Sequence, residues 1–290
     1  MRRGRGEMEQ RIQRMTNLSR TAGNKLRVAI AGLGPIGKGA AEALDAGMDG
    51  LVLAAVSAQN PEKHHNWLAG LKTPPSVLPI EQLSGVADIV IECAPAKLVR
   101  SVVAPFVAQG KTAIVLSAGA LLENEDLVEL ARQNGGQIVV PTGALIGLDA
   151  VTAAAVGEIR SVRMVTRKPV RGLAGAPYLV ENNIDIETIK EPLKIFDGTA
   201  REAAKGFPAN LNVAVALSLA GIGPDRTRLE IWADPALSRN VHRVEVESDS
   251  ARFSMSIENV PSENPKTGRI TALSVIAVLR KQFAPLRVGT

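Results

Sequence analysis

Three glycines near the start of the chain have a spacing that suits the binding of a diphosphate. Gly32, Gly34 and Gly37 follow the apolar run of residues 26–31, and a helical pattern begins directly after them. The first glycine permits a tight turn, the second lets the backbone approach a pyrophosphate, and the third lets the helix pack close to the strand. The helix presents free N–H groups and the positive end of its dipole to phosphate. In this context the motif predicts a dinucleotide-binding loop rather than a glycine-rich turn without a ligand.

The end of the second predicted strand bears on the choice of dinucleotide. An NAD site usually has an Asp or Glu about 20 residues after the glycines, where it binds the ribose 2′-hydroxyl. Residues 57–60 read Ser-Ala-Gln-Asn and contain no carboxylate, and Lys63, His64 and His65 follow. Nothing at this point would repel a 2′-phosphate. The sequence therefore admits NAD or NADP as the cofactor and leaves the choice between them open.

One of the three histidines lies where it could transfer a proton. His242 enters a strand pattern two residues after Asn240, so the two side chains would point to the same face. Imidazole is the side chain best suited to proton transfer near neutral pH, although a lone histidine beside a strand is more often structural. His64 and His65 lie in a polar loop, and we expect them at the surface.

Three cations stand where they could bind a carboxylate. Arg167 and Lys168 end a predicted strand and would form a carboxylate-binding pair. Lys266 precedes the last predicted helix, where the helix dipole disfavours a cation, so its placement points to an anionic partner. We expect these three residues, with Asn240, to bind substrate, and the sequence does not rank them.

Two further side chains allow more than one interpretation. Asn212, like Asn210, opens a long apolar helix, where it could cap the helix or offer its amide to a ligand. Cys93 ends an apolar strand with no activating base near it in the sequence, so we expect a small buried side chain rather than a catalytic thiolate. A single cysteine also excludes a multi-cysteine metal site within one chain, and we expect no metal.

Length and composition restrict the class of protein. The chain has 290 residues, of which 46% are hydrophobic and 22% charged, enough for a sizeable core and one or two domains. No apolar stretch approaches the roughly 20 residues needed to span a bilayer, and no apolar segment follows the N-terminal arginines as in a secretory signal. With a single cysteine, these features predict a cytoplasmic protein without membrane contact.

The net charge of +5 is concentrated in the N-terminal segment. Six arginines and two glutamates lie within residues 1–24, so four of the five net positive charges belong to this segment. We expect it to form a disordered tail. The folded body is close to neutral, which argues against nucleic acid as a partner.

Strand-like and helical patterns alternate through the first half. Short runs rich in Val and Ile occupy residues 26–31, 51–56, 88–93, 112–116 and 137–140, and helical patterns occupy 36–47, 97–108 and 124–134. This alternation predicts an α/β fold with a doubly wound, parallel (Rossmann) sheet. The second half has strand patterns at 162–168, 193–198, 228–233, 243–247 and 252–258, with helices at about 200–219 and 267–282. It predicts an α+β domain that carries the substrate site.

Ligands of a doubly wound sheet lie outside the carboxyl ends of its strands. The loops that follow the predicted strands should therefore contact the cofactor. From these loops we expect contacts by Gly32, Gly34, Pro35, Ile36, Gly37, Ser57, Cys93 and Ala94.

Many short blocks between residues 26 and 290 occur in an order that resembles the L-aspartate dehydrogenase family. Besides the glycine loop, the blocks are Glu92-Cys93-Ala94, residues 117–121, 141–144, 167–169, 196–200, 212–214, 217–221, 233–235, 240–242 and 264–267. The chain departs from the family pattern at Gly268, where Ser is more frequent, at Leu145-Ile146, and in its arginine-rich tail.

The resemblance implies roles for several residues. It implies that His242 is the catalytic histidine and that Ala144 and Asn212 contact the nicotinamide cofactor. Members of the family make iminoaspartate for NAD biosynthesis or interconvert aspartate and oxaloacetate, use NAD or NADP, and form homodimers. Their C-terminal segment returns to the nucleotide domain. We therefore expect a tail over 1–24, a dinucleotide-binding domain over 25–146 plus 264–290, and an α+β catalytic and dimerisation domain over 147–263.

Taken together, the sequence predicts an NAD(P)-dependent amino-acid dehydrogenase that converts L-aspartate to iminoaspartate and oxaloacetate, or catalyses the reverse reductive amination. A dehydrogenase or imine reductase of the same fold for another amino acid is one alternative. A non-catalytic nucleotide-binding regulator, which touches nucleic acid through the basic tail, is another.

Overall fold

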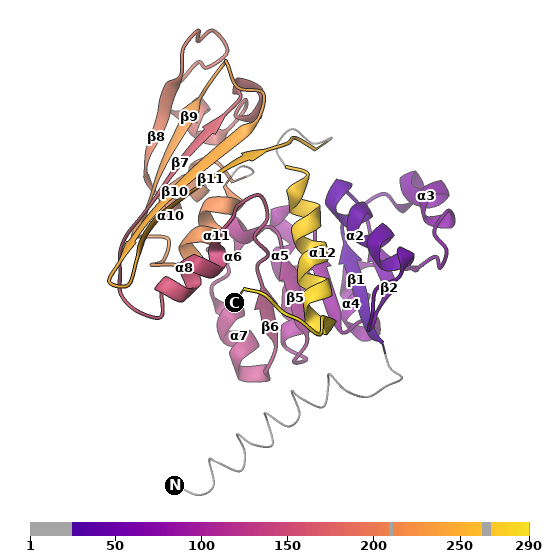
Figure 1. Ribbon diagram of the computed structural model, residues 1–290. Helices are drawn as coiled ribbons and strands as arrows, with labels where there is room; N and C mark the ends of the chain where they lie inside the picture. Colours follow the sequence, from indigo (N-terminus) through magenta and orange to yellow (C-terminus); the bar gives the residue numbers. More distant parts are fainter. Residues whose placement is uncertain (1–24, 209–210, 263–267, 290) are drawn as a thin grey trace, which may run out of the picture.

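A computed structural model of the chain describes residues 25–208, 211–262 and 268–289. The predictions made for the tail, for Asn210 and for Lys266 therefore lie outside the described residues. Two sheets form the framework, one built from the first half of the chain and one from the second (Figure 1).

The first sheet is parallel and doubly wound. Its six strands lie in the order β3-β2-β1-β4-β5-β6. They are β1 (Leu26–Ala31), β2 (Leu51–Ser57), β3 (Ser76–Val77), β4 (Ile89–Glu92), β5 (Thr112–Val115) and β6 (Gln137–Val139). The strand order reverses between β1 and β4, which is where a ligand binds in such a sheet. The predicted Rossmann class is confirmed.

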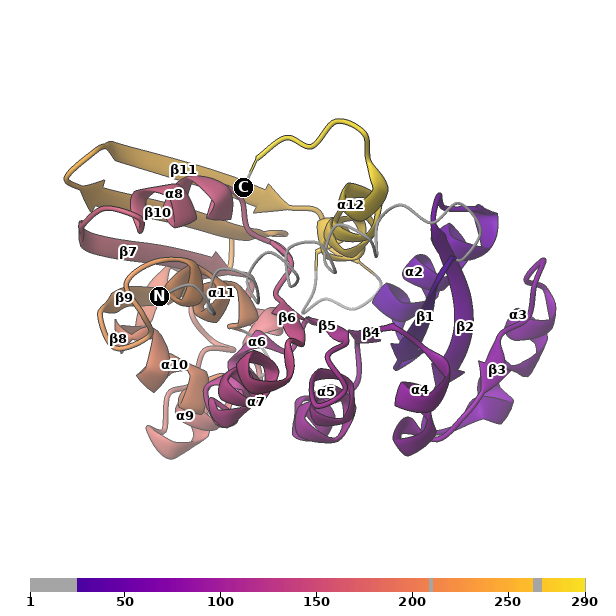
Figure 2. The ribbon, with the colours of Figure 1, turned by 90° about the horizontal axis from the view of Figure 1, so that it is seen from below.

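Helices cover both faces of this sheet because its central strands are apolar on both sides. Val28 and Ile30 of β1 pack with α2 (Pro35–Ala46) and α12 (Ile270–Phe283), whereas Ala29 and Ala31 pack with helices on the other face. These are α4 (Ile80–Val86), α5 (Val99–Val107) and α7 (Asp126–Asn134). Figure 2 shows the two helical layers on either side of the strands. Helix α12 thus lies beside α2, although more than 200 residues separate them in the sequence.

Short helices occupy the loops at the carboxyl ends of the strands. After β2 come η1 (Pro61–His64) and α3 (His65–Ala69), after β4 comes η2 (Ala96–Leu98), and after β5 comes α6 (Ala118–Leu121).

The second sheet is mixed and has the order β11-β10-β7-β9-β8. Its strands are β7 (Ile159–Lys168), β8 (Leu193–Thr199), β9 (Thr227–Ala233), β10 (Asn240–Ser248) and β11 (Arg252–Asn259). One face is apolar and is covered by helices, whereas the other face is charged. The helical elements of this half are α8 (Leu148–Ala154), η3 (Val170–Gly172), α9 (Pro177–Glu181), α10 (Ala200–Gly206) and α11 (Asn212–Ala220).

The single helix predicted over about 200–219 was wrong, because two helices occupy this stretch. A capping box of Thr199 and Glu202 starts α10, which ends at Gly206. Pro208 disfavours the helical conformation of the residue before it, so the helix cannot continue. Separating the helices leaves Asn212 free to open α11 at the boundary between the two sheets.

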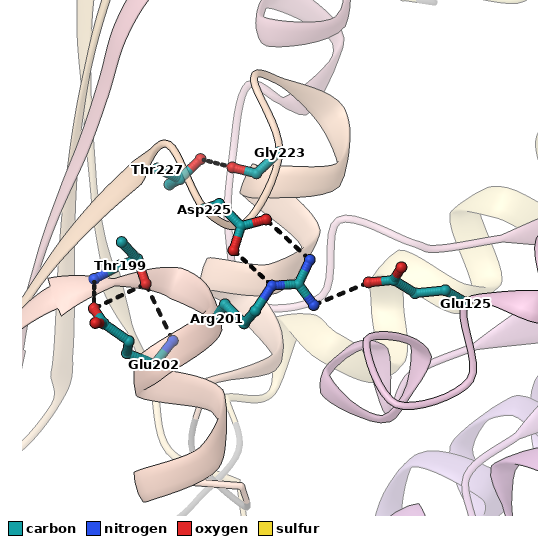
Figure 3. A network of polar contacts seen from close by, with 7 residues as sticks. All are labelled: Glu125, Thr199, Arg201, Glu202, Gly223, Asp225 and Thr227. Atoms are coloured by element: carbon teal, nitrogen blue, oxygen red, sulfur yellow. Dashed lines mark hydrogen bonds and ion pairs between the residues drawn. The ribbon is translucent and has the colours of Figure 1, made fainter.

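An ion pair ties α10 to the nucleotide-binding half, and a second joins α10 to the segment before β9. The guanidinium of Arg201 pairs with Asp225 at 2.6 Å and with Glu125, beside α7, at 2.9 Å (Figure 3). All three side chains are at least one-third exposed. Such surface pairs contribute about 0–1 kcal/mol each, so the pair with Glu125 orients the two halves more than it stabilises them.

Candidate active site

The glycine loop has the shape that a diphosphate requires. Gly32 adopts a φ of +104°, and a Cβ atom there would lie 2.4 Å from the carbonyl oxygen of Cys93. A Cβ on Gly37 would lie 2.0 Å from the carbonyl oxygen of Gly32. By contrast, a Cβ on Gly34 would meet nothing within 4 Å, and no side chain caps α2 at this residue. The loop is therefore packed against backbone at Gly32 and Gly37 and open at Gly34. An anion can approach the N-terminus of α2 at Gly34, so the loop fits the pyrophosphate of a dinucleotide.

Gly32→Ala should damage both the fold and coenzyme binding. The added methyl group clashes with the backbone at Cys93. A positive φ also costs an alanine residue about 1–3 kcal/mol of conformational free energy. We expect a fall in Tm of about 5 °C or more, together with weaker NADH binding. Gly34→Ala is the matched control because its Cβ meets open space, so it should lose coenzyme affinity at an unchanged Tm. Calorimetry and fluorescence titration would measure the two effects, and an unchanged Tm in Gly32→Ala would contradict the argument.

A cavity of about 280 Å³ lies between this loop and the second sheet. The ends of β4, β5 and β6 border it on one side, and the ends of β7 and β10 border it on the other. Eleven of the predicted site residues line it: Gly34, Pro35, Ile36, Gly37, Cys93, Ala94, Ala144, Lys168, Asn212, Asn240 and His242. Residues predicted from distant parts of the sequence are thus brought into one cavity.

Two further predicted residues, Gly32 at the base of the loop and Ser57 behind it, do not line the cavity. The backbone N–H of Gly32 donates to the carbonyl oxygen of Ser57 at 2.8 Å, which joins the ends of β1 and β2. Ser57 is buried and supports the loop from behind.

His242 stands at the polar end of an otherwise apolar sheet face. It is paired with Thr166 across β10 and β7, and its Nδ1 lies 2.8 Å from the Thr166 hydroxyl. This contact fixes the ring and leaves Nε2 as the nitrogen for a ligand. Burial, followed by the nearby ammonium of Lys168, lowers the pKa of His242 to about 3. The imidazole is therefore neutral at neutral pH, and its basicity should rise when an anion neutralises the Lys168 ammonium, which is one cause of the low pKa.

The depressed pKa of His242 predicts a loss of stability in acid. Between its ordinary value of 6.5 and about 3, the unfolded chain binds a proton that the folded chain does not, so stability falls as the pH falls. At pH 4 this amounts to about 3 kcal/mol of unfolding free energy relative to pH 7. Urea unfolding should show a smaller loss in His242→Gln and an unchanged loss in His65→Gln, whose histidine is exposed. The same pH dependence in all three proteins would contradict this assignment.

The prediction that Arg167 and Lys168 form a carboxylate-binding pair was wrong, because only Lys168 lines the cavity. Successive side chains of a strand point to opposite faces, so only one of the two can face the cavity. Lys168 is 2% exposed and lines the cavity. The guanidinium of Arg167 lies on the outer face, 5.1 Å from the ring centroid of Trp232 and 3.6 Å from the Asp234 carboxylate.

Asn212 bonds to the nucleotide-binding half instead of capping its own helix. Its Oδ1 accepts a hydrogen bond of 3.0 Å from the backbone N–H of Gly119 in α6. Because the oxygen is used in this way, the amide NH₂ group is the part of Asn212 that can donate into the cavity.

Hydrogen bonds from both halves hold the loop that carries Ala144. The hydroxyl of Ser274 in α12 accepts a hydrogen bond from the backbone N–H of Gly143 at 3.1 Å. From the second sheet, the side chain of Asn259 donates to the carbonyl oxygen of Ala144 at 2.9 Å. The wall of the cavity at Ala144 is thus fixed by residues more than 100 positions away in the sequence.

A buried carboxylate fastens the two strand ends beneath the cavity. Glu92 is 0% exposed and accepts hydrogen bonds from the backbone N–H of Ser117 at 2.9 Å and from its hydroxyl at 3.1 Å. Burial raises the pKa of Glu92, and these bonds oppose the shift. Burial, and then the charge of Glu92, raise the pKa of the Cys93 thiol well above its ordinary value. Cys93 therefore lines the cavity as a neutral thiol.

Sequence reasoning missed Thr166, and it did not assign the anchoring roles of Glu92 and Asn259. For Thr166 a signal was present, since it alternates with Val162 and Met164 on the face that also carries Lys168. For Asn259 no local signal exists, because its partner Ala144 is reached only through the tertiary fold.

Other features of the described residues do not compete with this cavity. A larger hollow of about 800 Å³ on the outer face of the second sheet is lined by arginines and carboxylates, several of which pair with one another. Within residues 25–208, 211–262 and 268–289, no group of three or more metal-ligating side chains is present. In the same ranges no helix is long and apolar enough to cross a membrane.

The sequences of known proteins match the chain over nearly its whole length. A family model described as the C-terminal domain of aspartate dehydrogenase matches residues 149–282, and one described as the NAD binding domain of homoserine dehydrogenase matches residues 32–141. The L-aspartate dehydrogenase of Bradyrhizobium diazoefficiens is 68% identical over 98% of this chain and 100% of its own length. The chain belongs to the L-aspartate dehydrogenase family. An L-aspartate dehydrogenase of Methanocella arvoryzae is a more distant relative, 41% identical over 91% of this chain and 99% of its own.

As a member of this family, the chain is an oxidoreductase that takes NAD or NADP as its coenzyme. The fold agrees with that of a solved relative. Aspartate dehydrogenase from Thermotoga maritima superposes with a TM-score of 0.70 at 22% identity, covering 92% of this chain and 100% of the other. The glycine loop described above is the place where the diphosphate of the coenzyme fits.

Proposed function

We propose that this chain catalyses the NAD(P)-dependent oxidative deamination of L-aspartate, and the reverse reductive amination. Membership of the L-aspartate dehydrogenase family supports the substrate. The observation that carries the chemistry is that His242 and Lys168 line the same cavity. A neutral buried imidazole and a buried ammonium line the same cavity as the glycine loop. The cavity therefore offers a proton acceptor and a carboxylate-binding cation beside the coenzyme.

Each cavity residue has a role in this proposal. The ammonium of Lys168 binds a substrate carboxylate, and the Asn240 side chain supplies a hydrogen bond beside it. Nε2 of His242 accepts a proton from the substrate ammonium group, while Thr166 holds the ring by Nδ1. Loss of that proton gives the amine the lone pair that it needs when Cα is oxidised. Bound NAD⁺ or NADP⁺ supplies the nicotinamide that accepts the hydride from Cα.

The residues of the cavity then assist hydrolysis of the imine. Water adds to the carbon of iminoaspartate, and a base must take one of its protons. His242, once it has passed the proton of the substrate ammonium to solvent water, is the described titratable side chain of the cavity suited to this step, because the Cys93 thiol stays neutral and Lys168 carries a positive charge. Return of the second proton to the amino group lets it leave as ammonia, which solvent protonates. The products are oxaloacetate and ammonium, together with the reduced coenzyme.

The proposal is tested by following absorbance at 340 nm with L-aspartate and each coenzyme, against a panel of L-glutamate, L-asparagine and L-alanine. L-Aspartate should give the highest kcat/KM. Faster turnover of another amino acid would favour a dehydrogenase or imine reductase of different specificity. Absence of hydride transfer, combined with salt-sensitive nucleic-acid binding that is lost on deleting residues 1–24, would favour the regulator.

We also propose that two copies associate through the outer face of the second sheet. Val165, Trp232 and Val241 form an apolar strip there, flanked by arginines and carboxylates, a pattern that can complement itself about a two-fold axis. Light scattering should give about twice the chain mass of 30.6 kDa, and a mass of one chain would reject the dimer. A cytoplasmic location is likewise a proposal, supported by the single cysteine, and so are the domain limits 25–146 plus 264–290 and 147–263.

A further inference from the structure

We propose that the coenzyme site prefers NADP to NAD, and that Lys38, Lys63 and His64 bind the 2′-phosphate of its adenosine. The inference rests on the coenzyme site alone and does not need the amino-acid substrate proposed above.

In a doubly wound sheet, the residues that distinguish NAD from NADP follow the end of the second strand, here β2. Its last residue, Ser57, is hydrogen-bonded to Gly32, so the segment that follows runs beside the phosphate-binding loop. In an NAD site a carboxylate here binds the ribose hydroxyls and repels a 2′-phosphate. Residues 57–61 contain no acidic side chain. The element that selects NAD is therefore missing from the position where it acts.

Cations gather around this position instead. Lys38 lies in the first turn of α2, directly after the glycine loop, where the helix dipole disfavours a positive charge. Its ammonium lies 5.1 Å from the ring centroid of Trp67 in α3, and the indole N–H is held by Glu42 at 2.9 Å. The contact with the indole ring fixes the position of the Lys38 ammonium. An anion bound next to it would offset the unfavourable interaction of this charge with the helix dipole.

His64 is the second residue of the proposed phosphate-binding group. It lies in η1 beside Lys63, and its Nδ1 is buried with no hydrogen-bond partner among the described residues. Burial lowers the pKa of His64, and the charges of Lys38 and then Lys63 lower it further. The imidazole therefore lies within the field of two ammonium groups that enter from two different elements.

Among the described residues no carboxylate forms an ion pair with Lys38 or Lys63, although Glu42 and Glu62 keep their charges nearby. Glu42 bonds to the Trp67 indole, and Glu62 is an exposed residue of η1. A phosphate monoester would give both lysines a counter-ion and would accept a hydrogen bond from the imidazole of His64, a residue that is partly exposed. The neutral 2′-hydroxyl of NAD cannot supply the charge.

The test is direct binding of NADPH and NADH to the full chain by fluorescence titration, without any amino acid. We expect Kd for NADPH to be at least about 10-fold lower than for NADH, since one charge-assisted hydrogen bond contributes about that factor. The double variant Lys63→Met, His64→Gln should raise Kd for NADPH about 10-fold or more and change Kd for NADH less than about 2-fold. Ala58→Asp should reverse the preference.

Lys72→Met is the matched control. Lys72 is an exposed lysine whose backbone N–H bonds to Asp45 near the C-terminal end of α2, away from the phosphate loop. It should leave both Kd values unchanged, which separates a local contact from a general loss of positive charge. Thermal melts of each variant would verify that the fold is retained.

Equal Kd values for NADPH and NADH in the parent protein would overturn the proposal. An equal loss of affinity for both coenzymes in the double variant would do so as well, because the residues would then support the loop in general. If NADPH binds preferentially while L-aspartate is not oxidised, this inference stands and the proposed substrate falls.

Discussion

Replacing His242 by alanine should lower kcat for amino-acid oxidation by about 10²–10⁴-fold, the usual cost of removing a general base. The imidazole is neutral at neutral pH and its Nδ1 is bound to Thr166, so no other described side chain of the cavity offers an equivalent proton acceptor. The coenzyme is held mainly by the glycine loop on the other side of the cavity, so its Kd should change less than about 3-fold. Stopped-flow absorbance and fluorescence titration would measure the two quantities.

The control for this variant is His65→Ala, which removes an exposed histidine that does not line the cavity and should leave kcat unchanged. His242→Gln, which retains a polar side chain, should be nearly as slow as the alanine variant because an amide does not take up a proton. Turnover equal to that of the parent protein in either variant would show that the proton goes elsewhere.

Replacing Lys168 by methionine should raise KM for L-aspartate by about 10²–10³-fold, because a buried carboxylate would lose its counter-ion. The neighbouring residue provides a sharp control. Arg167 points to the outer face of the sheet, so Arg167→Met should change KM less than about 2-fold, although it removes the same charge. A larger effect from Arg167 than from Lys168 would refute the side-chain orientation described here.

The same Lys168 variant should also shift the titration of His242. The ammonium of Lys168 lowers the pKa of His242, after burial, so removing this charge must raise it from about 3. Histidine proton resonances recorded as a function of pH in Lys168→Met and in the parent protein would show the direction of the change. An unchanged titration would mean that burial alone keeps the ring neutral.

Much of the first sheet was predictable from the sequence because its signals are local. Buried parallel strands read as short apolar runs, and Gly32 and Gly37 are required by backbone geometry alone. The predicted strand limits differ from the observed ones by only a few residues. The two-residue strand β3 was missed, since Ser76 and Val77 lie in a proline-rich loop without periodicity.

The candidate site was less predictable because it depends on pairing between distant segments. The alternation of β7 placed Lys168 and Arg167 on opposite faces, and this local signal could have separated them. The contact between Thr166 and His242 depends on the register of β7 against β10, which two sequences of similar polarity do not define. The hydrogen bond from Gly119 to Asn212 spans 93 positions and follows from how the two halves pack.

The loop around Ala144 has a mechanical consequence. Gly143 is bonded to a helix of one half and Ala144 to a strand of the other, so adjacent peptide groups are gripped from opposite sides. Any hinge motion that separates the halves must release at least one of these bonds or carry the loop along, and each broken bond costs about 0.5–1.5 kcal/mol. The loop therefore joins the coenzyme side of the cleft to the substrate side, so a relative movement of the two halves must alter the wall at Ala144.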